Sequence, residues 1–480
     1  MMSKEDVTNY IHAKQRETRI LSNVHLKGIK NQRNQFYKIK EHVDNFIETD
    51  GEYYNRCIMI PGLRGVGKTT ILYQLYQYLT RDKMIDENQI LYLDVHDLVS
   101  VFDLGVREVF ELFLEDIHHT TLVALDKKIF LFVDEAQLDR NWANYAKLIF
   151  DKSFNVFVVI TGSSALDFEL NTDAARRITR APMFPCNFQE YLLLKHNLSL
   201  SSNNFKDLIL KGDSNTISKS IECEDRIKKE LIRLDNDPEF ELKKFLHSQG
   251  FPFALNLDET NIHTLTNDII EKIVNDDLKS FQNFTNGTNN LILRIIAYLA
   301  VKKPGSTSNS AIAQSLNINV RTVNNILSAL EKSQLIFSIS AYGSAGKMLK
   351  KPQEHFFLTP SLKSAQNYRV GRYDLNHEKC YASLAENLVA STLFGLSNET
   401  KQALGLFYDS EKKGVDFILK HLDRTIPVEV GIGKKTKSQL VKALNRYDDA
   451  DYGILVSNRT SRIKSEKNVI YMPLSTFALI

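Results

Sequence analysis

Residues 62–69, which read Gly-Leu-Arg-Gly-Val-Gly-Lys-Thr, constrain the fold of this chain more than any other segment. They follow a short apolar run, residues 56–60, which ends at Pro61 as a buried strand would. A helical pattern begins at Lys68. Glycines at these positions let the backbone curl with its N–H groups pointing inward, and those donors, together with the N-terminus of the next helix, can cradle phosphate groups. The segment therefore predicts a phosphate-binding loop (P-loop) between a strand and a helix.

Each polar residue of this loop has an expected task. Lys68 would place its charge toward the β- and γ-phosphates, and the hydroxyl of Thr69 would ligate Mg²⁺. The alternative is a chance match to the pattern, and the strand before the loop and the helix after it argue against that alternative. The residues expected to contact the nucleotide are Gly62, Leu63, Arg64, Gly65, Val66, Gly67, Lys68, Thr69 and Thr70.

A second apolar run, residues 129–133, leads directly into Asp134 and Glu135. A carboxylate at the C-terminal tip of a strand next to the P-loop strand can hold Mg²⁺ through water. The following Glu135 can orient or deprotonate an attacking water, which makes it the expected catalytic base. The alternative is a pair of acidic residues that open a surface helix.

Two further polar groups complete the predicted catalytic set. A strand at 156–161 ends in a turn formed by Thr161, Gly162, Ser163 and Ser164. In P-loop ATPases with an extra strand between the two motifs, a polar residue here contacts the γ-phosphate or the water, so Thr161 and Ser163 are catalytic candidates. An arginine near the γ-phosphate stabilises charge in the transition state. Arg176, Arg177 and Arg180 are close enough in sequence to serve, with Arg177 named as the catalytic candidate, and the choice among the three stays open. Action on its own subunit, action on a neighbour and a solvated basic face all stay open.

The strands expected in this half of the chain are continuous apolar runs separated by helical patterns. Such runs are typical of a parallel sheet covered by helices on both faces, so the fold class is α/β. The expected strands are residues 56–60, 90–95, 129–133 and 156–161, and the expected helices are residues 68–79, 105–126 and 142–150.

Composition restricts the partners and the compartment. The formal net charge of +3 over 480 residues makes any nucleic-acid surface a local patch. The four cysteines fit no metal-binding spacing, which favours reduced thiols in the cytoplasm. No apolar run is long enough to span a bilayer, so no membrane partner is expected.

Several motifs together resemble the archaeal-type ATPases of the AAA+/STAND group. They are GLRGVGKTT, IFLFVDEAQ, VITGSS, the arginine cluster before FPCNFQEYL, and Gly250-Phe251-Pro252. The resemblance implies ATP and Mg²⁺ as cofactors, an ATPase core with a helical lid, and a homo-oligomer or a protein partner. It places Pro252 near the base or ribose. The chain departs from the family where Gln249 replaces the first of two glycines in the lid.

Residues 309–315 and 320–332 form a helix-turn-helix pattern, followed by expected strands at 335–341 and 355–359. This order is similar to a winged helix, with Lys347, Lys350 and Lys351 on the loop between the strands. The second helix could enter the major groove of double-stranded DNA through the polar side chains Arg321, Thr322, Asn324 and Asn325. The alternative is a packing module of the ATPase.

The last hundred residues resemble a restriction-endonuclease-like domain, whose motif places three acids around Mg²⁺ and a lysine beside the attacking water. The resemblance assigns the acids to Glu386, Asp416 and Glu429, a second metal site. Gly431 occupies the lysine position, Gly414 replaces a further acid, and Lys434 and Lys435 are out of register. An inactive or binding-only domain is favoured over a working nuclease.

These features predict five consecutive regions. They are a helical lead-in at 1–50, a P-loop ATPase core at 51–198, an insertion and helical lid at 199–288, a winged helix at 289–360, and a small α/β endonuclease-like domain at 376–480. Residues 199–236 are polar with weak periodicity, which indicates a linker or a mobile insertion that runs into a charged helix.

The favoured function is an ATP-hydrolysing switch that couples nucleotide state to a DNA-binding or partner-binding C-terminal half. The alternatives are an ATP-gated, metal-dependent DNA nuclease and a non-enzymatic DNA-binding regulator with a structural nucleotide.

Overall fold

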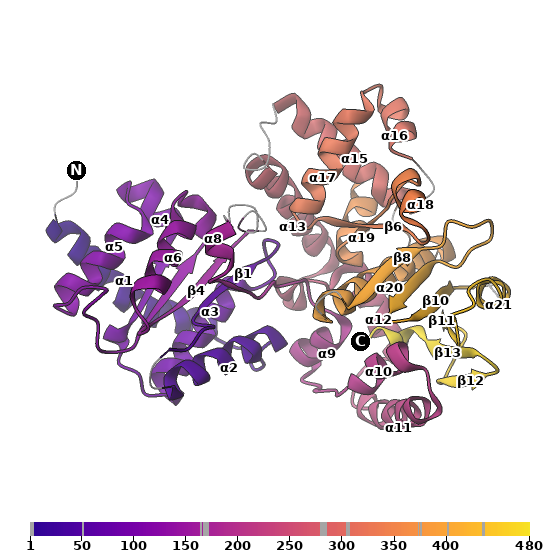
Figure 1. Ribbon diagram of the computed structural model, residues 1–480, viewed down its shortest axis with the longest axis horizontal. Helices are drawn as coiled ribbons and strands as arrows, with labels where there is room; N and C mark the ends of the chain where they lie inside the picture. Colours follow the sequence, from indigo (N-terminus) through magenta and orange to yellow (C-terminus); the bar gives the residue numbers. More distant parts are fainter. Residues whose placement is uncertain are drawn as a thin grey trace. The chain divides into compact units, whose positions relative to one another are not determined.

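The chain forms two compact units, Met1–Phe184 and Pro185–Ile480, and each is described by itself (Figure 1). The computed structural model describes residues 4–49, 52–163, 166, 172–278, 286–303, 308–372, 374, 377–400, 403–433 and 437–480. Within these ranges no helix has both the length and the apolar character needed to cross a membrane.

The first unit is built on a five-stranded parallel sheet with the order β2-β3-β4-β1-β5. The four strands expected from the sequence are confirmed, and β5 is a short addition. The strands are β1 (Cys57–Pro61), β2 (Ile90–Asp94), β3 (Ile129–Asp134), β4 (Val156–Gly162) and β5 (Thr179–Arg180). One expectation is wrong: β3 is not next to β1, because β4 pairs with both of them.

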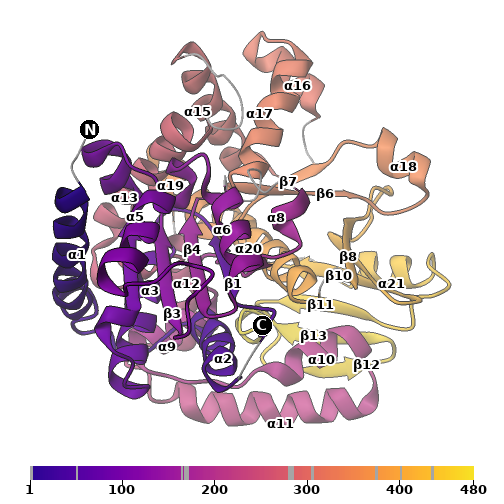
Figure 2. The ribbon, with the colours of Figure 1, turned by 60° about the vertical axis from the view of Figure 1, so that its left-hand side comes forward.

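Helices cover both faces of this sheet, as the continuous apolar strands indicate (Figure 2). On one face, α1, α5 and α6 pack in a common core with side chains from β1, β2, β3 and β4. On the other face, Phe46 of α2 lies 5.6 Å from Phe130 and 5.2 Å from Phe157, measured between ring centroids. The main helices are α1 (Lys4–His25), α2 (Asn34–Glu48), α3 (Lys68–Gln77), α5 (Val106–Leu112) and α6 (Trp142–Lys152).

Shorter helical turns join these elements. The helix expected at 105–126 is wrong beyond residue 117, because α5 continues only as one π-helical turn, η4. The short elements are η1 (Tyr78–Asp82), η2 (Glu87–Gln89), α4 (Val95–Asp97), η3 (Leu98–Phe102), η4 (Phe113–Ile117), η5 (Ala136–Leu138) and α8 (Thr172–Ala175).

The second unit begins with helices and ends in a mixed eight-stranded sheet with the order β12-β13-β11-β10-β9-β8-β6-β7. Its strands are β6 (Ile336–Ala341), β7 (Glu354–Phe357), β8 (Leu404–Tyr408), β9 (Phe417–His421), β10 (Arg424–Gly431), β11 (Gly453–Ser457), β12 (Lys464–Glu466) and β13 (Val469–Pro473). Its helices are α9 (Phe188–His196), α10 (Asn203–Lys211), α11 (Ser214–Leu231), α12 (Pro238–Ser248), η6 (Pro252–Asn256), α13 (Glu259–Lys272), η7 (Ile273–Asp277), α15 (Asn286–Val301), α16 (Asn309–Leu316), α17 (Val320–Lys332), α18 (Ala345–Lys350), α19 (Pro360–Arg369), α20 (Glu378–Glu399), α21 (Ser438–Leu444) and α22 (Leu474–Phe477).

The charged helix expected toward the end of residues 199–236 is confirmed as α11, whereas the linker or mobile insertion expected before it is wrong, because α10 lies there. Both helices lie beside the far edge of the C-terminal sheet (Figure 2). The inward face of α11 is partly polar, which explains its weak periodicity. Glu224 is 1% exposed and accepts hydrogen bonds from the backbone N–H of Ile463 (2.9 Å) and the hydroxyl of Thr476 (2.7 Å). A buried carboxylate with such donors stabilises the fold in a way that local sequence does not reveal.

The helix-turn-helix and the two strands after it form where the sequence predicts them, as α16, α17 and the antiparallel pair β6 and β7. Two details differ. The segment that carries Lys347 and Lys350 is the helix α18, and β6 pairs in parallel with β8 through Ser340 and Phe407. The hairpin therefore belongs to the same sheet as the C-terminal strands.

We expect the second unit to lose stability between pH 6.5 and about 4. Burial lowers the pKa of His247, His263 and His355 to about 4, from an ordinary value of 6.5. As the pH falls, the three histidines take up protons near pH 6.5 in the unfolded chain but only near pH 4 in the folded unit. The free energy of unfolding is therefore unaffected by them above pH 6.5 and decreases as the pH falls toward 4. Thermal unfolding followed at pH 7 and pH 5 should show a midpoint several degrees lower at pH 5.

The variant His355→Gln, which cannot take up the proton, should reduce this pH dependence. His377→Gln, at the exposed start of α20, is the matched control and should leave it unchanged. An identical midpoint for the parent at both pH values would contradict the expectation.

Candidate nucleotide site

The P-loop has the backbone that its glycines predict. Gly65 (φ 81°) and Gly67 (φ 100°) are both left-handed, and Gly67 is the N-cap of α3. Lys68 is 5% exposed, and its ammonium donates to the carbonyl oxygens of Gly62 (2.9 Å) and Leu63 (3.0 Å). Arg64 is half-buried on the same loop. The lysine ammonium is thus held against the loop backbone, on the residue that begins α3.

Gly62 is needed for a different reason. A Cβ atom there would lie 2.4 Å from the carbonyl oxygen of Met183, which is too close for any other residue. The backbone N–H of Met183 also donates to the carbonyl oxygen of Pro61 at 2.9 Å. The start of the P-loop is therefore held against a backbone segment more than a hundred residues later in the chain.

The carboxylate of Asp134 accepts hydrogen bonds from three hydroxyl groups, which come from three different elements. Oδ2 accepts from Thr69 Oγ1 on α3 (2.7 Å) and from the phenol of Tyr92 on β2 (3.0 Å), and Oδ1 accepts from Thr161 Oγ1 on β4. The structure therefore brings together three residues that the sequence selects, Thr69, Asp134 and Thr161. A carboxylate and two hydroxyl groups beside a P-loop are an oxygen donor set that suits Mg²⁺.

Sequence reasoning missed Tyr92, because it is one aromatic residue within an apolar strand. Burial raises its pKa above the ordinary value for a phenol, and the charge of Asp134 raises it further. The phenol thus stays protonated and serves as a donor to Asp134.

Glu135 follows Asp134 in a left-handed conformation (φ 55°), which is uncommon for a non-glycine residue. Its Oε2 accepts a hydrogen bond from Gln137 Nε2 at 2.6 Å. The other side of the same amide, Gln137 Oε1, accepts from the backbone N–H of Ser163 at 3.2 Å. Ser163 is 2% exposed, and Ser164 lies outside the described residues. Gln137 was not selected from the sequence, although it follows the acidic pair by two residues.

The N-terminal region also contacts the P-loop. The guanidinium of Arg33 donates to the carbonyl oxygens of Val66 (2.8 Å) and Phe184 (2.9 Å). His25 Nε2 lies 2.9 Å from Thr70 Oγ1, and burial lowers the pKa of this histidine. The lead-in helices are therefore part of the unit that shapes the loop, a role that their sequence pattern does not indicate.

Arg177 lies at the opposite edge of the sheet from the P-loop. Its Nε is 2.5 Å from Asp151 Oδ1 near the end of α6, and its NH1 donates to the carbonyl oxygen of Asp173 at 2.7 Å. It precedes β5, which runs parallel to β1, so it is at the amino edge, whereas Gly62 and Asp134 are at the carboxyl edge. This position argues against action of Arg177 on phosphates bound to its own unit, one of the three possibilities. Action on a neighbouring subunit stays a prediction.

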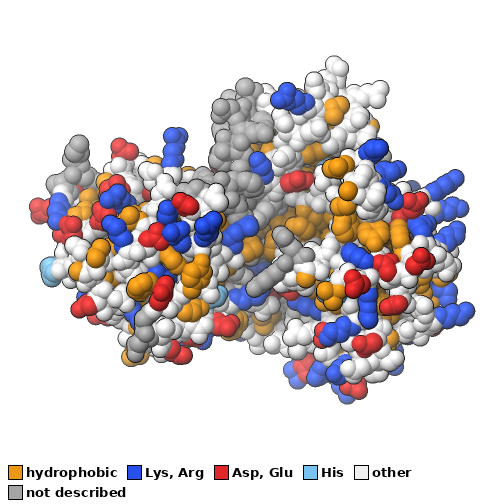
Figure 3. All heavy atoms as spheres, viewed as in Figure 1, with side chains coloured by type: hydrophobic (Ala, Val, Ile, Leu, Met, Phe, Trp, Pro, Cys, Tyr) orange, Lys and Arg blue, Asp and Glu red, His pale blue; other side chains and the backbone are white. Residues whose placement is uncertain are grey.

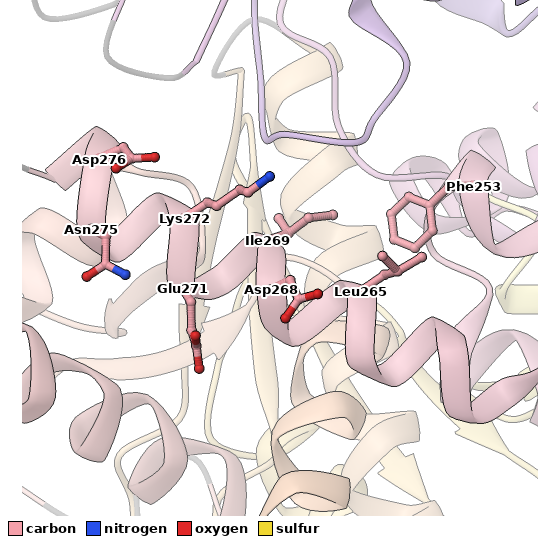
Figure 4. A pocket seen from close by; sticks show the side chains of 8 residues that line it. All are labelled: Phe253, Leu265, Asp268, Ile269, Glu271, Lys272, Asn275 and Asp276. Carbon is pink, nitrogen blue, oxygen red and sulfur yellow. The ribbon is translucent and has the colours of Figure 1, made fainter.

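Pro252 belongs to the second unit, where it begins η6. The preceding Gly250 packs against the start of α19: its N–H donates to Ser361 Oγ at 2.9 Å, and a Cβ atom there would lie 2.5 Å from Thr359 Oγ1. Contact of Pro252 with a base or ribose stays a prediction. An open pocket of about 530 Å³ lies beside η6 (Figure 4). It is lined by Phe253, Leu265, Asp268, Ile269, Glu271, Lys272, Asn275 and Asp276.

The three acids expected to form a second metal site lie in one region of the second unit but do not form that site. The ammonium of Lys303 is 3.8 Å from Glu386 Oε1 and 4.0 Å from Asp416 Oδ1. The backbone N–H of Val430 donates to Asp416 Oδ2 at 2.8 Å, and Glu429 is fully buried. Across the described ranges, no three His, Cys, Asp or Glu side chains are placed to hold a metal ion. A lysine cation and a backbone donor contact the carboxylates instead.

Two further titratable groups belong to this region. Burial raises the pKa of Glu354 on β7 to about 8, and the charges of Glu386 and Asp416 act in the same direction. Burial lowers the pKa of Lys363 on α19 to about 8. Lys434 and Lys435, the out-of-register lysines, lie outside the described residues.

Three family models match consecutive parts of the chain. An AAA domain model matches residues 54–192 and contains all of the first unit's strands. A domain of unknown function (DUF8612) matches residues 240–368, and another (DUF4143) matches residues 381–477. The AAA match and the five-stranded parallel sheet agree on the P-loop NTPase fold, with nucleotide binding as its function.

An uncharacterized protein of Methanocaldococcus jannaschii, MJ1637, is 32% identical over 444 residues, which are 92% of this chain and 88% of that protein. The chain belongs to the same family as MJ1637. A second uncharacterized protein of that organism, MJ1544, is 26% identical over 210 residues, or 43% of this chain and 38% of that protein.

Two solved structures that resemble this chain do so at low TM-scores. The Aeropyrum pernix ORC1 protein in complex with DNA has a TM-score of 0.29 and 13% identity, and the match covers 70% of this chain and 93% of that one. AMPPCP-bound DnaA from Aquifex aeolicus has a TM-score of 0.27 and 15% identity, with 64% and 91% covered. Scores this low carry no argument about DNA or partners.

We expect Tyr92→Phe to raise the Mg²⁺ concentration that nucleotide binding requires. The change removes one of the three hydroxyl donors that orient Asp134, at a cost of about 1 kcal/mol. Titration of Mg²⁺ at fixed fluorescent ATP analogue should show a roughly fivefold rise in the half-saturating concentration.

Tyr145→Phe is the matched control, because Tyr145 is equally buried in the first unit and its hydroxyl makes no hydrogen bond to the described residues. Equal Mg²⁺ dependence for Tyr92→Phe and Tyr145→Phe would contradict a role of Tyr92 at the metal.

Proposed function

We propose that this chain hydrolyses ATP with Mg²⁺ and uses the cycle as a conformational switch. The observation that carries the proposal is the position of Asp134, which accepts hydrogen bonds from Thr69 of the P-loop helix and Thr161 of β4. Glu135, the candidate base, is the next residue. Nucleotide binding alone does not require this second acid.

Each side chain has a task in the proposed reaction. The P-loop N–H groups and Lys68 bind the phosphates, and Thr69 and Asp134 hold Mg²⁺, which neutralises charge on the phosphate oxygens. Glu135 accepts a proton from the attacking water. Thr161 and Ser163 lie at the end of β4, where they can contact the γ-phosphate or that water.

Two substitutions separate binding from hydrolysis. Lys68→Ala removes the buried ammonium and should abolish tight ATP binding. Glu135→Gln removes the base but leaves the loop intact, so it should bind ATP normally and hydrolyse it about 100-fold or more slowly. The measurements are fluorescent nucleotide binding and steady-state phosphate release.

Lys38→Ala, at an exposed position of α2, is the control for loss of a positive charge. A parent protein that neither binds nor hydrolyses ATP, or a Lys68→Ala variant that matches the parent, would exclude the proposal.

We further propose that the second unit binds double-stranded DNA through α17. Arg321, Asn324 and Asn325 are exposed on this helix, whereas Val323 and Ile326 are buried in the unit. Figure 3 shows Lys and Arg side chains gathered where Figure 1 places α18 and α21, whose basic residues include Lys350 and Lys442. A polar helix face, together with basic side chains on other elements of the same unit, supports DNA over an apolar protein partner.

Arg321→Ala should weaken DNA binding by roughly 1–3 kcal/mol if the guanidinium contacts a base or phosphate. Electrophoretic mobility shifts at two salt concentrations, with and without ATP, measure the effect. Arg226→Ala, on the exposed face of α11 in the same unit, is the matched control.

The same binding mixtures distinguish the alternatives. Equal binding by Arg321→Ala and Arg226→Ala would leave α17 as a packing module. We expect the DNA to remain intact with Mg²⁺ or Mn²⁺. Gly431 occupies the position of the catalytic lysine, and the three acids of the second unit do not form a metal-binding group. Cutting that Asp416→Ala abolishes would support the nuclease instead.

A further inference from the structure

The side-chain amide of Gln137 connects Glu135 with Ser163, which lies 26 residues after Gln137 in sequence. Its Nε2 donates to Glu135 Oε2 at 2.6 Å, and its Oε1 accepts from the backbone N–H of Ser163 at 3.2 Å. A carboxylate only accepts and a backbone N–H only donates, so these partners determine the orientation of the amide. Gln137 thus joins the candidate base to the end of β4.

The surrounding backbone is shaped for this connection. Glu135 adopts its left-handed conformation directly before η5, and this turn brings Gln137 back toward the carboxylate. On the other side, a Cβ atom at Gly162 would lie 2.2 Å from Gln137 Oε1. The absence of a side chain at 162 therefore leaves the room that the amide oxygen occupies.

We propose that Gln137 is a positioning residue that orients Glu135 according to the state of the turn at Thr161 and Ser163. The inference rests on the proposed ATP hydrolysis and deepens it. When the γ-phosphate contacts this turn, any movement of the Ser163 backbone passes through the amide to Glu135. Gln137 contacts neither the phosphates nor the water in this scheme.

Position 137 needs a side chain that both donates to a carboxylate and accepts from a backbone N–H, which most other side chains cannot do. A glutamate at 137 would keep an acceptor for Ser163 but would place a second negative charge beside Glu135. A methionine of similar length would provide neither hydrogen bond. These two residues therefore separate the halves of the connection.

The experiment compares the parent with Gln137→Met and Gln137→Glu in steady-state ATP hydrolysis and in hydrogen–deuterium exchange of the Ser163 amide. For Gln137→Met, we expect kcat to fall by about 10- to 100-fold with KM and ATP affinity unchanged, because the base is displaced and the phosphate contacts are intact. The Ser163 amide should exchange faster even without nucleotide. For Gln137→Glu, kcat should fall similarly, but the Ser163 amide should keep its protection.

Gln89→Met is the matched control, because Gln89 is a half-buried glutamine of the same unit at the amino end of β2 and donates to the Lys128 carbonyl oxygen (2.8 Å). It should leave kcat and Ser163 exchange at parent values. An unchanged or raised kcat in Gln137→Met, or unchanged Ser163 exchange, overturns the positioning role. A parent that hydrolyses no ATP overturns the proposed function instead, and the exchange comparison still decides whether Gln137 holds the end of β4.

Discussion

The hydrogen bonds accepted by the carboxylate of Asp134 are the constraint on which the arrangement of the first unit depends. Side chains from α3, β2 and β4 all donate to it, so three segments distant in sequence must reach one edge of the sheet together. This is possible because the strands are parallel and β4 lies between β1 and β3, which places their carboxyl ends side by side. A carboxylate that is only 3% exposed needs such donors to offset the cost of its burial, so these contacts belong to the fold itself as well as to the candidate nucleotide site.

The N-terminal helices belong to this arrangement rather than preceding it. Arg33 holds the carbonyl oxygens of Val66 and Phe184 with one guanidinium, and Met183 approaches Gly62 closely. The P-loop is therefore supported from both ends of the unit. Its geometry depends on residues that no phosphate-binding motif includes.

In the second unit, the sequence predicts several helices and strands but not the surroundings of the acidic residues. Helices α16 and α17 and the following hairpin lie where the periodicity predicts them, because their buried residues repeat at regular intervals. The expected metal site failed because a motif specifies acids but not what surrounds them. Lys303 comes from beyond the end of α15 to contact Glu386 and Asp416, more than eighty residues before either acid. The weak periodicity of α11 has a similar cause, because its buried contacts, such as those of Glu224, are made with the end of the chain.

The sequence by itself determined the P-loop, the strands of the first sheet, and the choice of Thr69, Asp134, Glu135 and Thr161. These features follow from local rules: glycines permit the curled loop, and apolar runs that end in polar residues mark the carboxyl ends of strands. Only the tertiary structure decided that Tyr92 and Gln137 join this site, that Arg177 lies at the opposite edge, and that β6 continues into the C-terminal sheet. Each of these depends on which strands become neighbours, and strand order is set by packing between segments far apart in the chain.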